Sequence, residues 1–214
     1  MESCSLMKYE INFPAGEFDL FIDVGLSHNA PTSAEFLTHN PTSFVIGIEP
    51  NPNSCERVRA LELGERFHLI EAGVANSTKE TMAFNIIAQS DGDITDQGTS
   101  SFHKPSELFE NDGYEVLETK DVPVVALETI LDQVPWERVN NGVFRMKSDT
   151  QGFEDEVVAS LGKYMSRLEL LQIESSTAGQ YDNASHHDKV CELLEPYMVQ
   201  VKNDGWNAWF TKKK

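Results

Sequence analysis

The chain has 214 residues, of which 40% are hydrophobic and 24% charged, and its formal net charge is -18. This length and composition predict one folded domain, residues 1–214, and exclude global disorder. The acidic charge argues against a nucleic-acid partner, because proteins that hold nucleic acids gather Lys and Arg against the phosphates. No apolar run approaches the roughly 20 residues that span a bilayer, and the first ten residues lack the charged and apolar regions of a signal peptide. We therefore expect a cytoplasmic protein with no membrane partner.

Two short apolar runs near the start of the chain predict neighbouring parallel strands. Residues 18–24 and 44–48 are rich in β-branched and aromatic side chains, as strands buried on both faces are. Between them the sequence predicts a helix of about ten residues, with Thr32 as the N-cap and Glu35 completing a capping box. The unit has the size of a βαβ crossover.

Strands and helices alternate along the rest of the chain, which is typical of an open α/β sheet. Asn53 and Glu56 predict a capping box for a second helix, which ends at Gly64. The further predicted helices are residues 127–134, 153–167 and 183–197, and the further strands are residues 67–74, 81–87, 122–126, 143–147 and 168–173. Residues 198–202 and 208–211 predict a terminal antiparallel pair.

Two segments show no such pattern. Residues 1–16 predict an N-terminal arm or edge hairpin. Residues 88–121 are polar, acidic and contain glycine. A connection of this length is usually functional or disordered, so we predict a lid or substrate loop here.

Acidic residues follow four of the predicted strands. In open α/β sheets, ligands bind beyond the carboxyl ends of the strands, where these side chains meet. The second tip lies 24 residues after Gly25, a spacing at which a carboxylate accepts hydrogen bonds from ribose hydroxyls. The alternative is that each acidic residue is merely solvated or caps the next helix. The four residues are Asp23, Glu49, Asp149 and Glu174.

The turn after the first strand, Gly25-Leu26-Ser27-His28-Asn29, lacks the second and third glycines of a dinucleotide-binding turn. Those glycines let a pyrophosphate approach the backbone and a helix N-terminus. A nucleoside ligand without phosphates is therefore favoured over a dinucleotide.

Five segments, in order from Phe18 to Ser175, carry a resemblance to a known family: FIDVGLSHN, VIGIEPNP, VVALETIL, FRMKSDTQGFEDEVVASL and LLQIES. They are similar to the FkbM family of S-adenosylmethionine-dependent O-methyltransferases, and KSDTQGFEDEV resembles the family's Lys-x-Asp-x-x-Gly-x-Glu run most specifically. The resemblance implies the class I methyltransferase variant of the Rossmann sheet, doubly wound and mostly parallel, with seven strands and a C-terminal antiparallel hairpin. It implies a hydroxyl of a sugar or polyketide as the methyl acceptor.

The resemblance also implies which residues bind S-adenosylmethionine. These are Asp23, Gly25, Ser27 and Asn29 for the methionine part, Glu49 for the ribose, and Pro50, Asn51 and Ala72 around the adenine. The family usually has glycine where this chain has Asn29. Asn tolerates a left-handed backbone best among the other residues, so the turn can survive, whereas a side chain that closed the pocket would block the cofactor.

Methyl transfer to oxygen needs a group that removes the proton of the attacking hydroxyl. Asp149, at a central strand tip, is the first candidate for the base or acceptor anchor. Lys147 points to the same face and is expected to pair with a carboxylate, either for catalysis or as a structural ion pair. His103, in the predicted lid, is the alternative base. Glu174 can complete a Mg²⁺ site with Asp149, although two carboxylates are a small ligand set and a metal-free site is the alternative.

We therefore predict an O-methyltransferase that acts on a sugar, a glycan or a similar polyhydroxylated small molecule. A nucleic-acid acceptor is disfavoured by the charge, and amino methylation by the absence of an Asn-Pro-Pro-Tyr motif at the tip Ser148-Asp149-Thr150-Gln151. The alternatives are an NAD-type oxidoreductase, which the missing glycines disfavour, and a non-catalytic methyltransferase-fold module of a larger protein.

Overall fold

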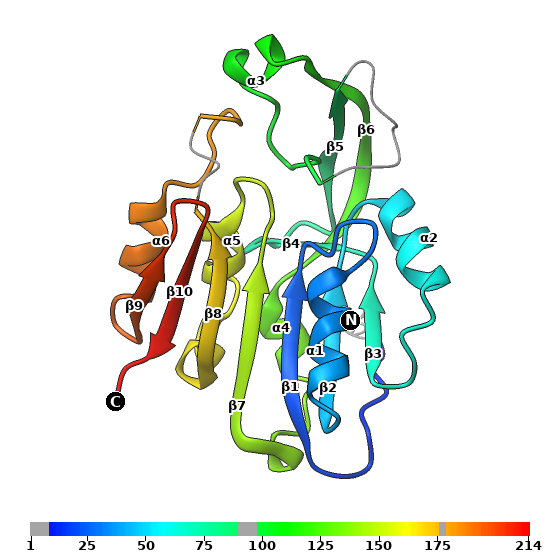
Figure 1. Cartoon of the computed structure of the whole chain (residues 1–214), viewed down its shortest axis with the longest axis vertical. Helices are drawn as coiled ribbons and strands as arrows, with labels where there is room; N and C mark the ends of the chain where they lie inside the picture. The colour runs from blue at the N-terminus through cyan, green and yellow to red at the C-terminus, as the bar shows by residue number, and fades with distance from the viewer. Residues whose placement is uncertain (1–8, 90–97, 176–178) are drawn as a thin grey trace, which may run out of the picture.

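A seven-stranded sheet forms the centre of the molecule in a computed structural model, which describes residues 9–89, 98–175 and 179–214. Its strand order is β3-β2-β1-β7-β8-β10-β9, and every neighbouring pair is parallel except those that β10 makes (Figure 1). The predicted doubly wound sheet with a C-terminal antiparallel hairpin is thus confirmed. The strands are β1 (Phe18–Val24), β2 (Ser43–Ile48), β3 (Phe67–Ile70), β7 (Val139–Ser148), β8 (Leu168–Glu174), β9 (Met198–Asn203) and β10 (Asn207–Lys212).

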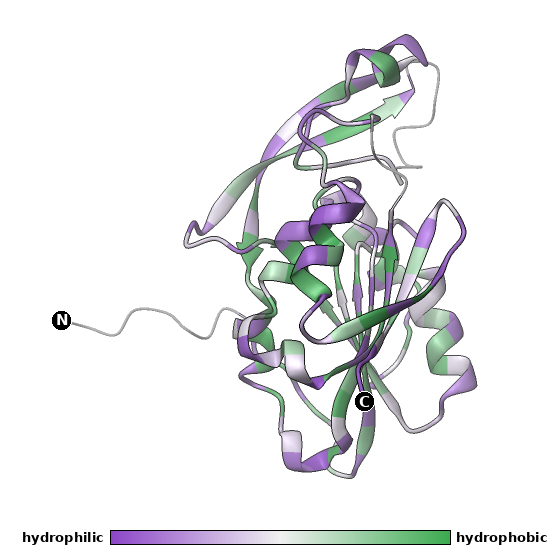
Figure 2. Cartoon of the chain, turned by 90° about the vertical axis from the view of Figure 1, so that its left-hand side faces the viewer, coloured by the Kyte–Doolittle hydropathy of each residue, from purple (hydrophilic) through white to green (hydrophobic). Residues whose placement is uncertain are grey.

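Helices cover both faces of this sheet, which Figure 2 shows nearly edge-on. On one face, α1 (Pro31–His39) and α2 (Pro52–Ala60) pack against the strands through Leu37 and Val58. The main core lies on the other face, where α4 (Leu127–Leu131), α5 (Glu154–Ala159) and α6 (His187–Leu194) meet the sheet. Among the residues that the structure describes, no helix is long and apolar enough to cross a membrane.

The central strands form because their side chains are apolar on both faces. All six residues of β2 are buried, and Phe18 and Phe44 of the adjacent strands are each 1% exposed. Burying one such side chain contributes roughly 1.5–3 kcal/mol. Residues 9–16 add to this core without forming a strand, since Ile11 is buried and Phe13 stacks on Phe18. The predicted edge hairpin is not present in residues 9–16, and residues 1–8 lie outside the described chain.

A second sheet rises beyond the carboxyl ends of the central strands (Figure 1). It contains β4 (Gly73–Val74), β5 (Thr81–Gln89) and β6 (Tyr114–Val125) in the order β4-β6-β5. Strands β5 and β6 pair antiparallel along their whole length, and α3 (Glu107–Asn111) precedes β6. We call residues 81–125 the arm.

The second sheet differs from three predictions. Residues 88–121 were expected to lack regular structure, but they contain α3 and most of β6, while residues 90–97 lie outside the described chain. The predicted strand 67–74 is divided into β3 of the central sheet and β4 of the second sheet. The predicted strand 81–87 is β5, which joins the second sheet and does not extend the central one.

Both predicted helix caps are wrong. The N-cap of α1 is Ala30, in a left-handed conformation with no side-chain cap, and Thr32 already lies inside the helix. The N-cap of α2 is Asn51, whose side chain accepts from the backbone N–H of Asn53. In both helices a proline follows the cap, where its missing N–H has no cost.

The later helices are shorter than predicted. The helix predicted at 153–167 is α5 followed by a 3₁₀ helix, η2 (Gly162–Arg167), and the one predicted at 127–134 is α4, before the 3₁₀ helix η1 (Trp136–Arg138). The helix predicted at 183–197 is α6, which begins only at His187.

Candidate active site

A cavity of about 180 Å³ opens at the carboxyl ends of β1, β2 and β7, where the strand order reverses. Such a switch point is where open α/β sheets bind ligands. Six residues predicted from the sequence as site residues line this cavity: Gly25, Ser27, Glu49, Pro50, Ala72 and Asp149. Further lining residues that the sequence reasoning did not propose are Gly73, Val74, Phe84, Gly98, Ser100, Phe102, Thr150 and Gln151.

The turn after β1 is held in a conformation that only glycine fits at its first position. Gly25 has a φ of 79°, and a Cβ added to it would lie 1.9 Å from the backbone oxygen of Asp149. Ser27 has a φ of 55°, which costs a non-glycine residue roughly 1–2 kcal/mol. Its backbone N–H donates to Glu49 Oε2 at 3.1 Å, so the second strand tip stabilises the turn.

Asn29 lies at the surface and does not line the cavity. The expectation that it would take the left-handed conformation is wrong, because Ser27 and Ala30 take it instead. A glycine at position 29 is therefore not needed for this turn. The side chain of Asn29 does not close the cavity.

Glu49 is buried at the tip of β2, and both of its oxygens accept from backbone N–H groups. Oε2 accepts from Ser27, and Oε1 accepts from Asn51 at 2.8 Å. Burial raises the pKa of Glu49 to about 7, although these hydrogen bonds act to lower it. The backbone N–H of Leu26 also donates to this carboxylate, and Glu49 lines the cavity.

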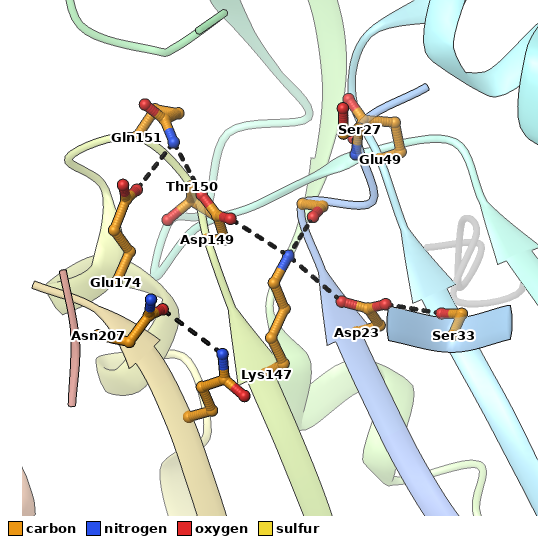
Figure 3. A network of polar contacts seen from close by, with 12 residues as sticks. Asp23, Ser27, Ser33, Glu49, Lys147, Asp149, Thr150, Gln151, Glu174 and Asn207 are labelled. Carbon is orange, nitrogen blue, oxygen red and sulfur yellow. Dashed lines mark hydrogen bonds and ion pairs between the residues drawn. The ribbon is translucent and has the colours of Figure 1, made fainter. Parts of the chain in front are cut away.

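Lys147 lies between Asp23 at the tip of β1 and Asp149 at the tip of β7 (Figure 3). Its Nζ donates to the backbone oxygen of Gly25 at 2.6 Å and lies 3.5 Å from Asp23 Oδ1 and 3.6 Å from Asp149 Oδ2. Burial alone would lower the pKa of Lys147, but the attraction of the two carboxylates outweighs it and raises the pKa. The predicted ion pair with a carboxylate is thus present, with two carboxylates instead of one.

Asp23 does not line the cavity. Its side chain is 1% exposed, and Oδ2 accepts from Ser33 Oγ at 2.7 Å. Burial raises the pKa of Asp23, while Lys147 and Ser33 oppose that rise. Asp23 therefore acts on the site through Lys147, whose Nζ also contacts the backbone oxygen of Gly25.

Asp149 is the most accessible acid of the strand tips, with 40% of its side chain exposed. Oδ1 accepts from Gln151 Nε2 at 2.8 Å, and Lys147 lies beside Oδ2. The same Gln151 nitrogen donates to Glu174 Oε2 at 2.8 Å, so an amide stands between the two predicted metal ligands. No group of three or more potential metal ligands is found within the described ranges.

Two further acids lie beside Asp149. Glu154, at the start of α5, accepts from the backbone N–H of Thr150 at 2.9 Å and from that of Gly152, and burial raises its pKa to about 7. Burial, together with the charges of Asp149 and Glu154, raises the pKa of Glu174 to about 9.

His103, the alternative base, packs against Phe153 with ring centroids 5.4 Å apart and does not line the cavity. Burial lowers the pKa of His103, so its imidazole is neutral at neutral pH. Its neighbour Phe102 does line the cavity, where its ring contacts Gly73: a Cβ at Gly73 would lie 2.2 Å from the ring. Phe102 was not proposed as a site residue, because it lies in residues 88–121, where the sequence shows no periodic pattern.

The residues present fit S-adenosylmethionine. Glu49 offers a carboxylate for ribose hydroxyls, and Phe102 offers an aromatic face beside Gly73 for a base. Asn51 is 1% exposed, and its Nδ2 has no hydrogen-bond partner within the described part of the chain. Asn51 itself does not line the cavity, whereas Glu49 and Pro50, which precede it, do.

The sequence of the chain also matches a known protein family. Residues 23–200 match the family model described as Methyltransferase FkbM domain. No curated protein matches the chain.

Three similar solved structures are methyltransferases by their descriptions. A precorrin-6y C5,15-methyltransferase from Geobacter metallireducens is 15% identical, with a TM-score of 0.43 and coverage of 93% of this chain and 82% of that chain. A putative rRNA methylase from Clostridium thermocellum is 12% identical, with a TM-score of 0.45 and coverage of 93% and 89%. A putative O-methyltransferase from Nostoc punctiforme is 8% identical, with a TM-score of 0.45 and coverage of 92% and 52%. Because the family model extends over most of the sequence, the chain belongs to the FkbM family of S-adenosylmethionine-dependent methyltransferases.

Proposed function

We propose that this methyltransferase transfers the methyl group to a hydroxyl of a sugar, a glycan or a similar polyhydroxylated small molecule. The observation that carries the proposal is the placement of Asp149, an accessible carboxylate in the cavity between the expected cofactor turn and the arm. A hydroxyl becomes a better nucleophile when a carboxylate within hydrogen-bond reach takes its proton during attack. Asp149 is the proposed base.

The cofactor supplies an electrophilic methyl group, and this chain's residues align the acceptor with it. Lys147 fixes Asp149 relative to Gly25, because its Nζ contacts both sides of the cavity. The turn at Gly25 and the carboxylate of Glu49 are the proposed contacts to the methionine and ribose parts. Alignment of two reacting atoms at close approach can supply several kcal/mol of a reaction barrier.

The cavity wall supports a polyhydroxylated acceptor. The wall combines the aromatic ring of Phe84 with the polar side chains of Ser100, Thr150 and Gln151. Aromatic rings pack against the C–H faces of a sugar, while hydroxyl and amide groups hydrogen-bond to its hydroxyls. The net charge of -18 repels phosphorylated and nucleic-acid acceptors.

The arm remains our candidate for the segment that covers the acceptor, as proposed for residues 88–121. Ser101 of this segment pairs with β5 through Asn85 and donates from Oγ to the backbone oxygen of Gln151 at 2.7 Å. Tyr181 donates to the backbone oxygen of Thr99 at 2.7 Å. These contacts hold residues 99–101 over the tip of β7.

The test has two parts. Calorimetry with S-adenosylhomocysteine measures cofactor binding, and transfer of a labelled methyl group to a panel of monosaccharides measures the reaction. Asp149→Ala should keep S-adenosylhomocysteine affinity and lose about 10²- to 10⁴-fold in the transfer rate, the usual contribution of a general base. The matched control is Asp121→Ala, at an exposed position of the arm.

Full transfer activity in Asp149→Ala would refute the role of the carboxylate. Wild-type protein that binds S-adenosylhomocysteine but methylates only proteins or nucleic acids would refute the acceptor class. Absence of any binding would favour the non-catalytic module, and the family match already favours a methyltransferase over the NAD-type oxidoreductase.

A further inference from the structure

The side-chain amide of Gln151 bridges two carboxyl groups at the tips of β7 and β8 (Figure 3). Nε2 donates to Asp149 Oδ1 and to Glu174 Oε2, both at 2.8 Å. On the other side, Oε1 lies 2.9 Å from the hydroxyl of Tyr181, whose one hydrogen is shared with the backbone oxygen of Thr99. Both N–H groups of the amide are therefore used, and the surrounding partners determine which way the amide points.

The backbone holds this amide in place. Gln151 has a φ of 56° and is followed by Gly152 with a φ of 94°, a pair of left-handed residues that turns the side chain between the two strand tips. The backbone oxygen of Gln151 accepts from Ser101 Oγ at 2.7 Å. A Cβ at Gly152 would lie 2.9 Å from the Cβ of Ala184, so the turn is also closely packed from outside.

The charges around the amide require a donor at this place. Asp149, Glu154 and Glu174 converge here, and burial together with the charges of Asp149 and Glu154 raises the pKa of Glu174. On the opposite side of Asp149 the donor is Lys147, 3.6 Å from Oδ2. Oδ1 accepts from the Gln151 amide, and Glu174 also shares a side-chain hydrogen bond with Asp149.

A divalent cation would serve the same two carboxyl groups in a different way. Mg²⁺ lies about 2.1 Å from its oxygen ligands and needs ionised carboxylates. Here a neutral donor, the side-chain amide of Gln151, lies 2.8 Å from one oxygen of each carboxyl group. The arrangement therefore satisfies Asp149 without bringing a second positive ion into the cavity.

We propose that Gln151 is a positioning residue whose amide stands where a divalent cation would otherwise bridge Asp149 and Glu174, so that Asp149 is aimed at the acceptor without a metal ion. The role of Asp149 rests on the proposed function. The placement of the amide does not. This inference decides between the two alternatives that the sequence left open for Asp149 and Glu174.

The test measures Mn²⁺ binding by electron paramagnetic resonance, which reports free Mn²⁺ and needs no acceptor. Gln151→Glu replaces the two donors with a third carboxylate and should bind one Mn²⁺ per chain, with an affinity at least about tenfold above that of the wild type. The matched control is Gln172→Glu on β8, which adds the same charge nearby but faces Asn207 and not the two acids. It should bind Mn²⁺ no more tightly than the wild type.

The site of any Mn²⁺ is tested with Asp149→Asn. Added to Gln151→Glu, it should remove the gain in affinity, and added to the wild type it should change nothing. Wild-type protein that binds Mn²⁺ tightly and loses it in Asp149→Asn would overturn the proposal, since a cation would then occupy the bridge. Gln151→Glu that folds and gains no more than Gln172→Glu would overturn it as well.

Calorimetry with S-adenosylhomocysteine on each variant separates this inference from the proposed function. Retained binding in Gln151→Glu shows that the fold and the cofactor side are intact. If Gln151→Glu does not fold, the comparison of the wild type with Asp149→Asn still decides whether a cation occupies the bridge. Loss of S-adenosylhomocysteine binding in the wild type would count against the proposed function and leave the Mn²⁺ result standing.

Discussion

Replacing Lys147 with methionine should destabilise the protein by about 3–5 kcal/mol, the usual cost of removing one partner of a buried ion pair. Lys147 is 12% exposed, and it is the cation beside Asp23, whose side chain is 1% exposed. Without it, Asp23 retains the hydrogen bond from Ser33 and no positive charge within salt-bridge distance among the described residues. Methionine fills a similar volume, so the loss is mainly electrostatic.

The loss should depend on pH in a defined direction. Burial already raises the pKa of Asp23, and removing Lys147 removes the largest opposing influence. A carboxyl group whose pKa is higher in the folded than in the unfolded chain stabilises the fold at acid pH, and this contribution is lost as the pH rises through the folded-state pKa. The destabilisation of Lys147→Met should therefore be smallest near pH 4, about the pKa of an unfolded Asp, and should grow toward neutral pH.

Urea denaturation followed by tryptophan fluorescence, at several pH values from 4 to 8, gives the free energy of unfolding. The matched control is Lys163→Met, which removes an exposed ion pair with Asp132 and should cost less than about 1 kcal/mol. In a double-mutant cycle with Asp23→Asn, the coupling energy should exceed about 1.5 kcal/mol, in the upper range for residues in contact. A coupling below about 0.5 kcal/mol, or equal losses in Lys147→Met and Lys163→Met, would refute the reasoning.

Three further predictions concern cofactor binding, each measured by calorimetry with S-adenosylhomocysteine. Gly25→Ala should weaken binding by at least about tenfold, because the left-handed backbone costs alanine roughly 1–2 kcal/mol and its Cβ meets the backbone of Asp149; unchanged affinity would show that the turn does not touch the ligand. Phe102→Ala should weaken binding roughly 5- to 100-fold, the range for loss of one aromatic stacking contact with a base, whereas Leu117→Ala at an exposed arm position should not. The affinity of the wild type should fall below about pH 7, where Glu49 becomes protonated, and Glu49→Gln should remove this pH dependence.

The sheet and its tips were predictable because the signals for them are local and strong. Continuous apolar runs such as 18–24 and 44–48 become buried parallel strands, and of the acids at their ends Glu49 lines the cavity while Asp23 is buried beside Lys147. The terminal hairpin was predictable from two short runs around Gly205. In each of these elements the hydrophobic pattern decides the outcome alone.

The strand predicted at 81–87 is β5 and the one predicted at 122–126 is the end of β6, but the pairing within the arm was not predictable, because it joins residues far apart in the sequence. Only two of the twelve residues of β6 are buried, and its sequence YEVLETKDVPVV contains no long apolar run. Its partner β5 pairs with it from Thr81 opposite Pro123 to Gln89 opposite Tyr114. No local pattern encodes such a register, and the cavity residues that the arm supplies were missed with it.

The two helix-cap predictions were wrong for a different reason. Sequence rules favour Thr32 and Asn53 because their side chains can accept from helix N–H groups. In both cases the chain turns earlier: Ala30 takes the cap position next to a tight turn, and Asn51 takes it two residues after Glu49. The position of the strand tip therefore overrides the local preference of the capping residue.

Residues 76–124, which include nearly all of the arm, begin and end close together, because the backbone N–H of Ala75 donates to the oxygen of Val125 at 3.2 Å. An insertion whose two ends meet can change in length and sequence at little cost in loop entropy, since that cost grows only slowly with length. A different segment could therefore replace residues 76–124 between Ala75 and Val125, while Lys147 and Asp149 keep the positions that the central sheet gives them. Because Phe84 and Phe102 lie in this segment and line the cavity, a replacement segment would have to supply that part of the cavity wall as well.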